Sequence, residues 1–306
     1  MNNAIGRIAL ARIALGGAQF GLDYGVTNKA GQVSPQALQA ILLEAARCGI
    51  DMVDTAAQYG NSEAAIGEAL KSVGRFRLVT KTASLAEARS AHHAVELLNE
   101  GFAASLSQLG VSRVEGFLFH RASDLTGEYG MELWNAARAL KEAGFVSRIG
   151  VSVYSGNEIN AVLERHSPDI VQLPYNLLDQ RLRIDGSLVR LHDAGVEVHA
   201  RSAYLQGILL SDPAQLPPFL AGLGDQIAAF RQAMQEIGET VQAGLLACLL
   251  QRSEIARIVA GVTNVEELTS LAAAAEAGQR LAAAHDFSEW AVDAPEMLNP
   301  ALWPKS

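Results

Sequence analysis

Cysteine is scarce in this 306-residue chain, which contains only Cys48 and Cys248. Both lie in apolar stretches of helical pattern far apart in the sequence, so a disulfide framework is excluded and we expect two buried thiols in a reducing cytoplasm. The sequence also lacks CxxC and HExxH spacings, and the adjacent pair His92-His93 would point its two rings apart on a helix. No metal site is expected.

Long apolar runs and an excess of positive charge are lacking as well. No uncharged apolar run reaches the ~18 residues that span a bilayer. The run that begins at Ile8 is soon interrupted by Arg12, which excludes a signal-peptide core. The net charge of −9 argues against nucleic acid and anionic membrane surfaces as partners. We expect a cytoplasmic protein that binds a small molecule and, without an obvious dimerisation seam, a monomer.

Hydrophobic residues are plentiful, at 49% against 19% charged residues. Short apolar runs alternate with amphipathic stretches along the chain, a pattern typical of repeated βα units. The apolar runs predict strands at 13–16, 52–54, 77–81, 116–120, 149–152, 170–173, 196–200 and 258–260. The amphipathic stretches predict helices at 35–48, 62–72, 91–109, 131–143, 157–164, 186–194, 226–237 and 265–277, with a further helix at 241–250.

Eight strands with eight principal helices predict an α/β fold of the (β/α)8 TIM-barrel type, with an open doubly wound sheet as the main alternative. No Ser-, Pro- or Gly-rich linker divides the chain, so residues 1–306 are predicted to form a single domain. Residues 278–306 are the predicted C-terminal tail. It either closes over a ligand mouth or covers the outside of the barrel.

Polar residues stand where predicted strands end. The stretch from Asp54 to Glu63 links a predicted strand to a predicted helix, and it contains Tyr59; Lys81 and His120 end the next two strands. Each residue alone has an ordinary explanation, such as a helix cap or loop packing, but the carboxyl ends of barrel strands form the active face. A phenol donates its proton more easily beside a cation, Asp54 would hold Lys81, and His120 would orient a carbonyl oxygen. A phenol acid without a nucleophile favours carbonyl reduction, or its reverse, over hydrolysis.

Several motifs lie at the ends of the first six predicted strands. They are Leu15-Gly16-Gly17-Ala18-Gln19-Phe20-Gly21, Asp51-Met52-Val53-Asp54-Thr55-Ala56 with Tyr59-Gly60 and Ser62-Glu63, Thr80-Lys81, Phe119-His120, Arg148-Ile149-Gly150-Val151-Ser152 and Val171-Gln172-Leu173-Pro174-Tyr175-Asn176. Their combination resembles the aldo-keto reductase family over about residues 15–274. The resemblance implies a barrel that transfers hydride between a nicotinamide and an aldehyde or ketone without a metal. It implies Asp54, Tyr59, Lys81 and His120 as catalytic residues, with Tyr59 as the general acid in reduction and the general base in the reverse reaction.

The resemblance also assigns residues to the cofactor. Ser152 and Gln172 are expected to hydrogen-bond the nicotinamide carboxamide, although Val153 stands where the family often has Asn. Arg201 replaces an aromatic residue that often stacks on the nicotinamide. It would either lie against that ring or approach the pyrophosphate or an anionic substrate. The other expected cofactor contacts are Ser202, Gly207, Gly261, Thr263, Asn264 and Glu267.

The adenosine end of the expected site leaves the choice of cofactor open. The family resemblance implies NADP(H), whose 2′-phosphate is usually held by Lys or Arg after the eighth strand. This chain has neither between Arg257 and Arg280, and Glu267 stands where Arg or Gln is frequent. NAD(H) is therefore a serious alternative.

Candidate substrate contacts on other loops of the active face are Phe20, Tyr24, Arg121, Tyr154 and Tyr204. The segment 19–28 is similar to bacterial members of the family associated with sugar metabolism or surface polysaccharides, so the expected substrate is a small carbonyl compound or a sugar. Two other functions fit the same residues. One is a non-catalytic nicotinamide-binding partner subunit, which retention of all four catalytic residues disfavours. The other is a lyase or isomerase with Lys81 as a Schiff-base amine, which Asp54 disfavours by keeping that amine protonated.

Overall fold

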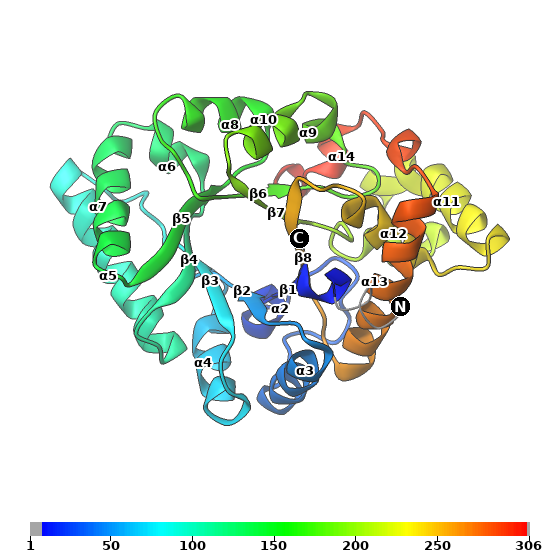
Figure 1. The fold of residues 1–306 in the computed structure, drawn as a ribbon, viewed down its shortest axis with the longest axis horizontal. Helices are drawn as coiled ribbons and strands as arrows, with labels where there is room; N and C mark the ends of the chain where they lie inside the picture. The colour runs from blue at the N-terminus through cyan, green and yellow to red at the C-terminus, as the bar shows by residue number, and fades with distance from the viewer. Residues whose placement is uncertain (1–7, 305–306) are drawn as a thin grey trace.

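The computed structural model describes residues 8–304 of the chain. Eight strands pair in parallel and in chain order, and β1 also pairs with β8, so the sheet closes into a barrel (Figure 1). The strands are β1 (Ile13–Gly16), β2 (Met52–Asp54), β3 (Arg77–Lys81), β4 (Val114–Phe119), β5 (Val146–Ser152), β6 (Ile170–Pro174), β7 (Glu197–Arg201) and β8 (Ile255–Ala260). The predicted (β/α)8 barrel is confirmed, and the open doubly wound sheet is excluded.

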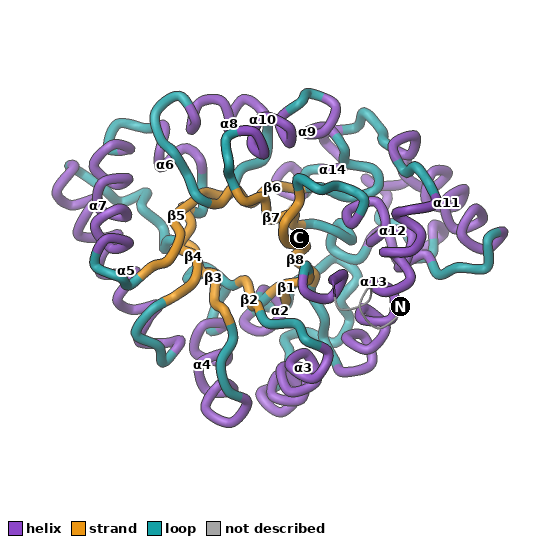
Figure 2. The backbone as a smooth tube through the Cα atoms, viewed as in Figure 1, coloured by secondary structure: helices purple, strands orange, loops and turns teal. Residues whose placement is uncertain are grey.

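Helices surround the barrel, as the purple ring around the orange strands in Figure 2 shows. The longer helices are α3 (Pro35–Cys48), α4 (Ser62–Val73), α5 (Ala91–Leu109), α7 (Gly130–Glu142), α8 (Gly156–Leu163), α10 (Ser187–Asp193), α11 (Gly224–Glu236), α12 (Val241–Leu250) and α13 (Val265–Ala284). The short ones, absent from the prediction, are α2 (Ala18–Gly21), α6 (Ala122–Thr126), α9 (Arg181–Ile184), α14 (Pro295–Leu298), η1 (Ile208–Leu210), η2 (Pro213–Gln215), η3 (Pro218–Leu223), η4 (Ser288–Trp290) and η5 (Pro300–Leu302). Segments this short carry no helical period in the sequence, which is why the pattern missed them.

Helix α3 illustrates how local sequence sets these boundaries. The Ser34 side chain accepts a hydrogen bond from the Ala37 N–H, and Pro35 occupies the first turn, where its missing N–H costs nothing. At the other end Gly49 adopts a left-handed φ of 86°, which suits glycine. The predicted bounds of this helix are confirmed for that reason.

The tail begins later than predicted, because α13 continues through Ala284. Beyond it, Trp290 packs edge-on against Phe230 of α11, with ring centroids 5.0 Å apart, and Trp303 lies 5.6 Å from the ring of Phe219 in η3. The described part of the tail therefore covers the flank of the barrel beside α11 and η3.

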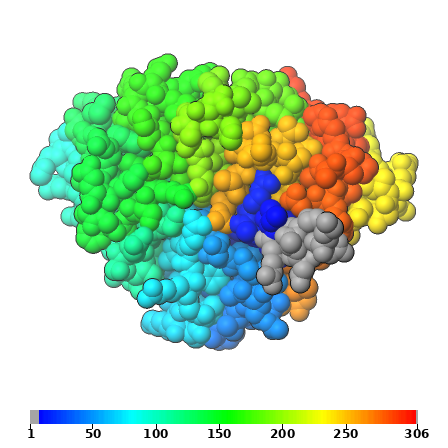
Figure 3. Space-filling model, in the orientation of Figure 1, coloured from blue at the N-terminus to red at the C-terminus, as the bar shows by residue number. Residues whose placement is uncertain are grey.

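The amino-terminal end of the barrel is closed by the first described residues. The Arg12 guanidinium donates hydrogen bonds to the backbone carbonyls of Leu250, Arg252 and Ile255. In Figure 3 these first residues (blue) lie beside the segment around β8 (orange) near the middle of the face shown.

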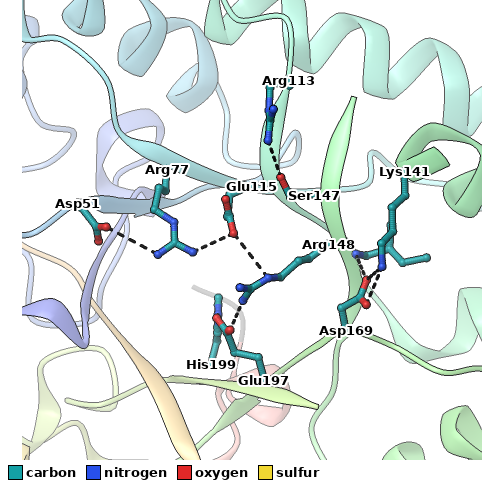
Figure 4. A network of polar contacts seen from close by, with 11 residues as sticks. Asp51, Arg77, Arg113, Glu115, Lys141, Ser147, Arg148, Asp169, Glu197 and His199 are labelled. Atoms are coloured by element: carbon teal, nitrogen blue, oxygen red, sulfur yellow. Dashed lines mark hydrogen bonds and ion pairs between the residues drawn. The ribbon is translucent and has the colours of Figure 1, made fainter. Parts of the chain in front are cut away.

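An ion-pair network runs across the starts of β3, β4, β5 and β7 (Figure 4). Arg77 contacts Glu115 at 2.8 Å, Arg148 lies 3.6 Å from Glu115 and also contacts Glu197, and His199 Nε2 lies 2.9 Å from Glu197 Oε1. The prediction treated charged residues as strand boundaries, and it therefore began β4 and β5 too late. The charged residues Glu115 and Arg148 belong to these strands and are paired there.

Glu197 should make the fold sensitive to acid. The hydrogen bond from His199, aided by the charge of Arg148, lowers the pKa of Glu197 from 4.5 to about 2. A depressed carboxyl pKa contributes stability that is fully present above pH 4.5 and is lost as the pH falls towards 2. We therefore expect the free energy of unfolding in urea to fall between pH 5 and pH 3, and Glu197→Gln to flatten that slope. Glu87→Gln, at an exposed and unpaired carboxylate, is the control; equal slopes in the two variants would contradict the assignment.

Candidate active site

Strand register brings the predicted polar residues to one end of the barrel. Ala14, Met52, Val79, Leu118 and Ile170 form a buried cluster inside the barrel. Side chains two positions apart on a strand point the same way, so the residues that follow these by two positions also face inward, nearer the carboxyl ends. These residues are Asp54 of β2, Lys81 of β3, Gln172 of β6 and His120, which directly follows β4 although it was predicted as the last residue of that strand.

A cavity of about 700 Å³ opens at these carboxyl ends. Most of the residues predicted for the site line it. They are Tyr24, Asp54, Tyr59, His120, Ser152, Tyr154, Gln172, Arg201, Ser202, Tyr204, Gly207, Gly261, Thr263, Asn264 and Glu267. Lys81 lies beneath the cavity, 1% exposed.

The four predicted catalytic residues lie together. Lys81 Nζ donates to Asp54 Oδ2 at 2.7 Å and to the Thr55 carbonyl at 2.8 Å. The same ammonium lies 5.1 Å from the centroid of the Tyr59 ring, and the His120 ring meets the Tyr59 ring edge-on with centroids 5.7 Å apart. A phenol at the cavity wall thus has a buried cation behind it and an imidazole beside it.

The charges of this cluster differ sharply. Burial, together with the charge of Lys81, lowers the pKa of His120 from 6.5 to about 4, so His120 is a neutral imidazole at physiological pH. Burial opposes the charge on Lys81, but Asp54 and Tyr59 outweigh it and the pKa of Lys81 is raised. The cluster therefore holds a permanent cation, and His120 can donate a hydrogen bond without acting as the acid.

Close packing of two glycines fixes the Tyr59 loop. A Cβ on Gly21 would lie 1.9 Å from the Tyr59 carbonyl oxygen, and one on Gly60, whose φ is +58°, would lie 2.3 Å from the Gly21 carbonyl. The start of α4 is tied to the same turn, because Ser62 Oγ donates to the Gly17 carbonyl at 2.7 Å. Any larger residue at either glycine would push the phenol out of place.

Gln172 joins the cluster to the cavity. Its Nε2 donates to Asp54 Oδ1 at 2.7 Å, whereas its buried Oε1 has no partner among the residues that the structure describes. Ser152, the neighbour of Gln172 in the β5–β6 ladder, lines the cavity beside it. An unpartnered acceptor next to a hydroxyl suits a primary carboxamide, so these residues fit a nicotinamide.

Arg201 ends β7 at the cavity wall. Its guanidinium carbon lies 4.1 Å from the centroid of the Tyr154 ring, and its Nη2 donates to the Val153 carbonyl at 3.1 Å. Val153 itself is buried, so the residue that replaces the family's usual Asn offers only its backbone to the site.

The loop after β7 has an unusual backbone. Ser202, Leu205 and Gln206 have φ values of 61°, 47° and 55°, and Gly207 follows at 90°. Non-glycine residues rarely adopt this region, and such strain gathers at ligand sites, where consecutive N–H groups can face an anion. Ser202, Gln206 and Gly207 line the cavity, so this loop forms part of its wall.

The start of α13 forms the far end of the cavity. Asn264 caps the helix by accepting from the Glu267 N–H at 2.8 Å. The Glu267 carboxylate turns back to accept from the Thr263 N–H at 2.7 Å and from the Thr263 hydroxyl at 3.0 Å. Both donors of Thr263 are therefore already used by a carboxylate, and the Glu267 N–H is used by the Asn264 side chain.

Two predicted substrate contacts lie elsewhere. Phe20 is fully buried in the core, because it belongs to the short helix α2, and Arg121 is an exposed residue before α6 that does not line the cavity. Tyr204 does line it, but it is mostly buried and its hydroxyl accepts from Gln242 at 3.3 Å.

In the loop between α2 and α3, sequence reasoning named Tyr24 but missed three other residues of the cavity wall. Thr27, Asn28 and Lys29 line the cavity, and Thr27 Oγ1 donates to the Gln206 carbonyl at 3.2 Å. The only signal was the length of this glycine-containing loop.

Among residues 8–304 no helix has the length and apolar character to cross a membrane, and no cluster of three His, Cys, Asp or Glu side chains could hold a metal.

Fold and site together define a (β/α)8-barrel protein whose carboxyl-end cavity carries an Asp, Tyr, Lys and His cluster. The family model described as "Aldo/keto reductase family" matches residues 12–284. The chain belongs to the aldo/keto reductase family, which confirms the resemblance seen in the sequence.

Individual relatives agree with this assignment. The chain is 30% identical over 220 residues to a protein of Escherichia coli (strain K12) named "NADH-specific methylglyoxal reductase", covering 66% of each chain. It is 30% identical over 190 residues to an aldo-keto reductase of Mycolicibacterium vanbaalenii, covering 60% of this chain and 64% of that one. The chain thus spans a little under two thirds of the length of these relatives. The holo form of an aldo-keto reductase from Bacillus halodurans has the same fold, with a TM-score of 0.67 at 20% identity over 91% of this chain and 94% of that one.

Proposed function

We propose that this protein is a nicotinamide-dependent oxidoreductase of small aldehydes and ketones, with Tyr59 as its general acid. The observation that carries the proposal is the buried Lys81–Asp54 pair, which sets a permanent cation 5.1 Å from the Tyr59 ring at the cavity wall. When bound, the cofactor supplies hydride for carbonyl reduction and accepts it in the reverse reaction.

The roles of the residues follow from their charges. Tyr59 gives its proton to the carbonyl oxygen as the alcohol forms, and the Lys81 ammonium stabilises the phenolate that remains. His120, neutral because its pKa is about 4, donates a hydrogen bond to the same oxygen. Asp54 holds Lys81 in place and is itself held by Gln172, so one hydrogen-bond chain links the Lys81 ammonium to the carboxamide site.

We propose NADH as the preferred cofactor. Glu267 occupies the α13 terminus with its own carboxylate, so a 2′-phosphate there would meet a negative charge and find the Thr263 donors taken. Two ribose hydroxyls could instead donate to that carboxylate. The printed name of the Escherichia coli relative, an NADH-specific enzyme, supports the same choice.

Charge reversal at Glu267 should change the cofactor preference. In Glu267→Arg we expect the ratio of kcat/KM for NADPH to that for NADH to rise at least about tenfold, the worth of one charge-assisted hydrogen bond. Glu266→Arg is the matched control, since Glu266 is an exposed neighbour on α13 that does not line the cavity. A wild-type enzyme that prefers NADPH, or an equal change in both variants, would contradict the proposal.

The proposed activity is tested by titrating the protein with NADH and NADPH and then offering a panel of aldehydes, ketones and reducing sugars. We expect NADH binding and turnover of small carbonyl compounds, methylglyoxal among them, because the Escherichia coli relative is named a methylglyoxal reductase. Cofactor binding without turnover of any carbonyl compound would contradict it.

We further propose a monomer in the cytoplasm; the free thiols Cys48 and Cys248 suit a reducing compartment.

A further inference from the structure

Arg201 is a cation in the cavity without an anionic partner. Its contacts are the Tyr154 ring, the Val153 carbonyl and, at 3.4 Å, the Ser202 hydroxyl, and no carboxylate lies within ion-pair distance of it in residues 8–304. A guanidinium has five N–H donors, and these contacts use two of them. The remaining donors are free to meet a ligand.

The anionic groups that line the same cavity are already engaged. Asp54 is paired with Lys81, and Glu267 is held by Thr263 at the far end. A partly buried charge without a partner is costly, so a retained one points to a ligand that brings the opposite charge.

Arg201 belongs to the reacting end of the cavity. Its inward position at the end of β7 faces the barrel axis together with His120 and Gln172. Its charge also contributes to the lowered pKa of His120, after burial and the charge of Lys81.

We propose that Arg201 binds a carboxylate of the substrate, so that the enzyme prefers aldehydes and ketones that carry an acid group. The inference rests on the proposed function. The Tyr154 ring lies 4.1 Å from the guanidinium carbon, and three of the five N–H donors of Arg201 have no partner among residues 8–304. Paired N–H donors of a guanidinium match the two oxygens of a carboxylate. In reduction the Tyr59 proton goes to the carbonyl oxygen, and a bound NADH would supply the hydride to the carbonyl carbon and be left as NAD⁺. The carboxylate keeps its charge and only orients the substrate.

The first test compares two aldehydes of the same shape, 4-formylbenzoate and 4-formylbenzamide, with their 3-formyl isomers to vary the reach. In the wild type we expect the formylbenzoate to have a higher kcat/KM than the matching formylbenzamide, in whichever of the 3-formyl and 4-formyl pairs is reduced faster. Arg201→Gln should lower the carboxylate-to-amide ratio about 10- to 100-fold. Arg121→Gln is the matched control, since Arg121 is exposed and outside the cavity, and it should leave the ratio unchanged. An equal loss on both aldehydes in Arg201→Gln, or a ratio that does not move, overturns the assignment.

The second test does not depend on turnover. Calorimetric titration of the enzyme–NADH complex should give tighter binding of benzoate than of benzamide, and Arg201→Gln should remove the difference. If no aldehyde turns over but benzoate binding depends on Arg201, the proposed reductase function fails and the anion site stands. If aldehydes turn over and benzoate binds no better than benzamide to the wild type, the anion site fails alone. A weaker NADH affinity in Arg201→Gln with an unchanged ratio would assign Arg201 to the cofactor and sink the proposal.

Discussion

Tyr59→Phe is expected to lower the turnover of a reactive aldehyde about 10²- to 10⁴-fold while NADH still binds. The change removes one oxygen atom, and with it the proton that the carbonyl oxygen must receive. The ring of Phe would keep its place against His120 and above Lys81, because the backbone of the loop is fixed by Gly21 and Gly60. The loss should therefore appear in the rate of hydride transfer in a single turnover and not in the cofactor affinity.

No neighbouring group can replace the phenol. His120 is the other proposed hydrogen-bond donor to the substrate's carbonyl oxygen. With a pKa of about 4 it is neutral at pH 7, and giving up its remaining proton would leave an imidazolate that is far too basic. Tyr129→Phe, outside the cavity, is the control for the substitution itself. A Tyr59→Phe enzyme that keeps turnover within tenfold of the wild type would rule out Tyr59 as the acid.

The fold could be predicted wherever local sequence sets the structure. The bounds of β1, β2 and β3 follow from short apolar runs, and those of α3 and α5 from their capping serines and terminal glycines. Helix α13 was predicted to end at Ala277, one residue before Gly278. Gly278 lies inside the helix instead, where a Cβ would come within 2.8 Å of the Ala243 carbonyl, so this glycine serves the close packing of α13 on α12.

The site could be predicted in part, for a related reason. Strand ends in a barrel converge, so the approach of Asp54, Lys81 and His120 follows once eight strands are assigned. The wall made by Lys29 and its neighbours depends on a contact between Thr27 and Gln206, which are 179 positions apart. The pairing of Arg201 with Tyr154 likewise depends on which way two loop side chains turn, and no periodicity records that.

Lys81→Met is expected to be the most destabilising of the substitutions considered, by about 3–5 kcal/mol. It deletes a cation that is 1% exposed and leaves the Asp54 carboxylate in the barrel with Gln172 as its remaining side-chain donor. Urea unfolding of the variant gives the free energy directly. Lys141→Met is the control, because Lys141 pairs with Asp169 at 2.6 Å where both side chains are partly exposed, and such a pair contributes about 1 kcal/mol or less.

The double variant Lys81→Met/Asp54→Leu separates the contribution of Lys81 to stability from its contribution to catalysis. Replacing both charges with apolar groups removes the unpaired carboxylate, so we expect it to recover most of the stability lost in Lys81→Met. Activity should not return, since the phenolate of Tyr59 would still lack its cation. Stability and catalysis thus depend on Lys81 for different reasons: the fold needs the Asp54 charge to be matched, whereas the proton transfer needs the ammonium itself. A double variant that regains turnover together with stability would show that Lys81 acts only as a structural partner of Asp54.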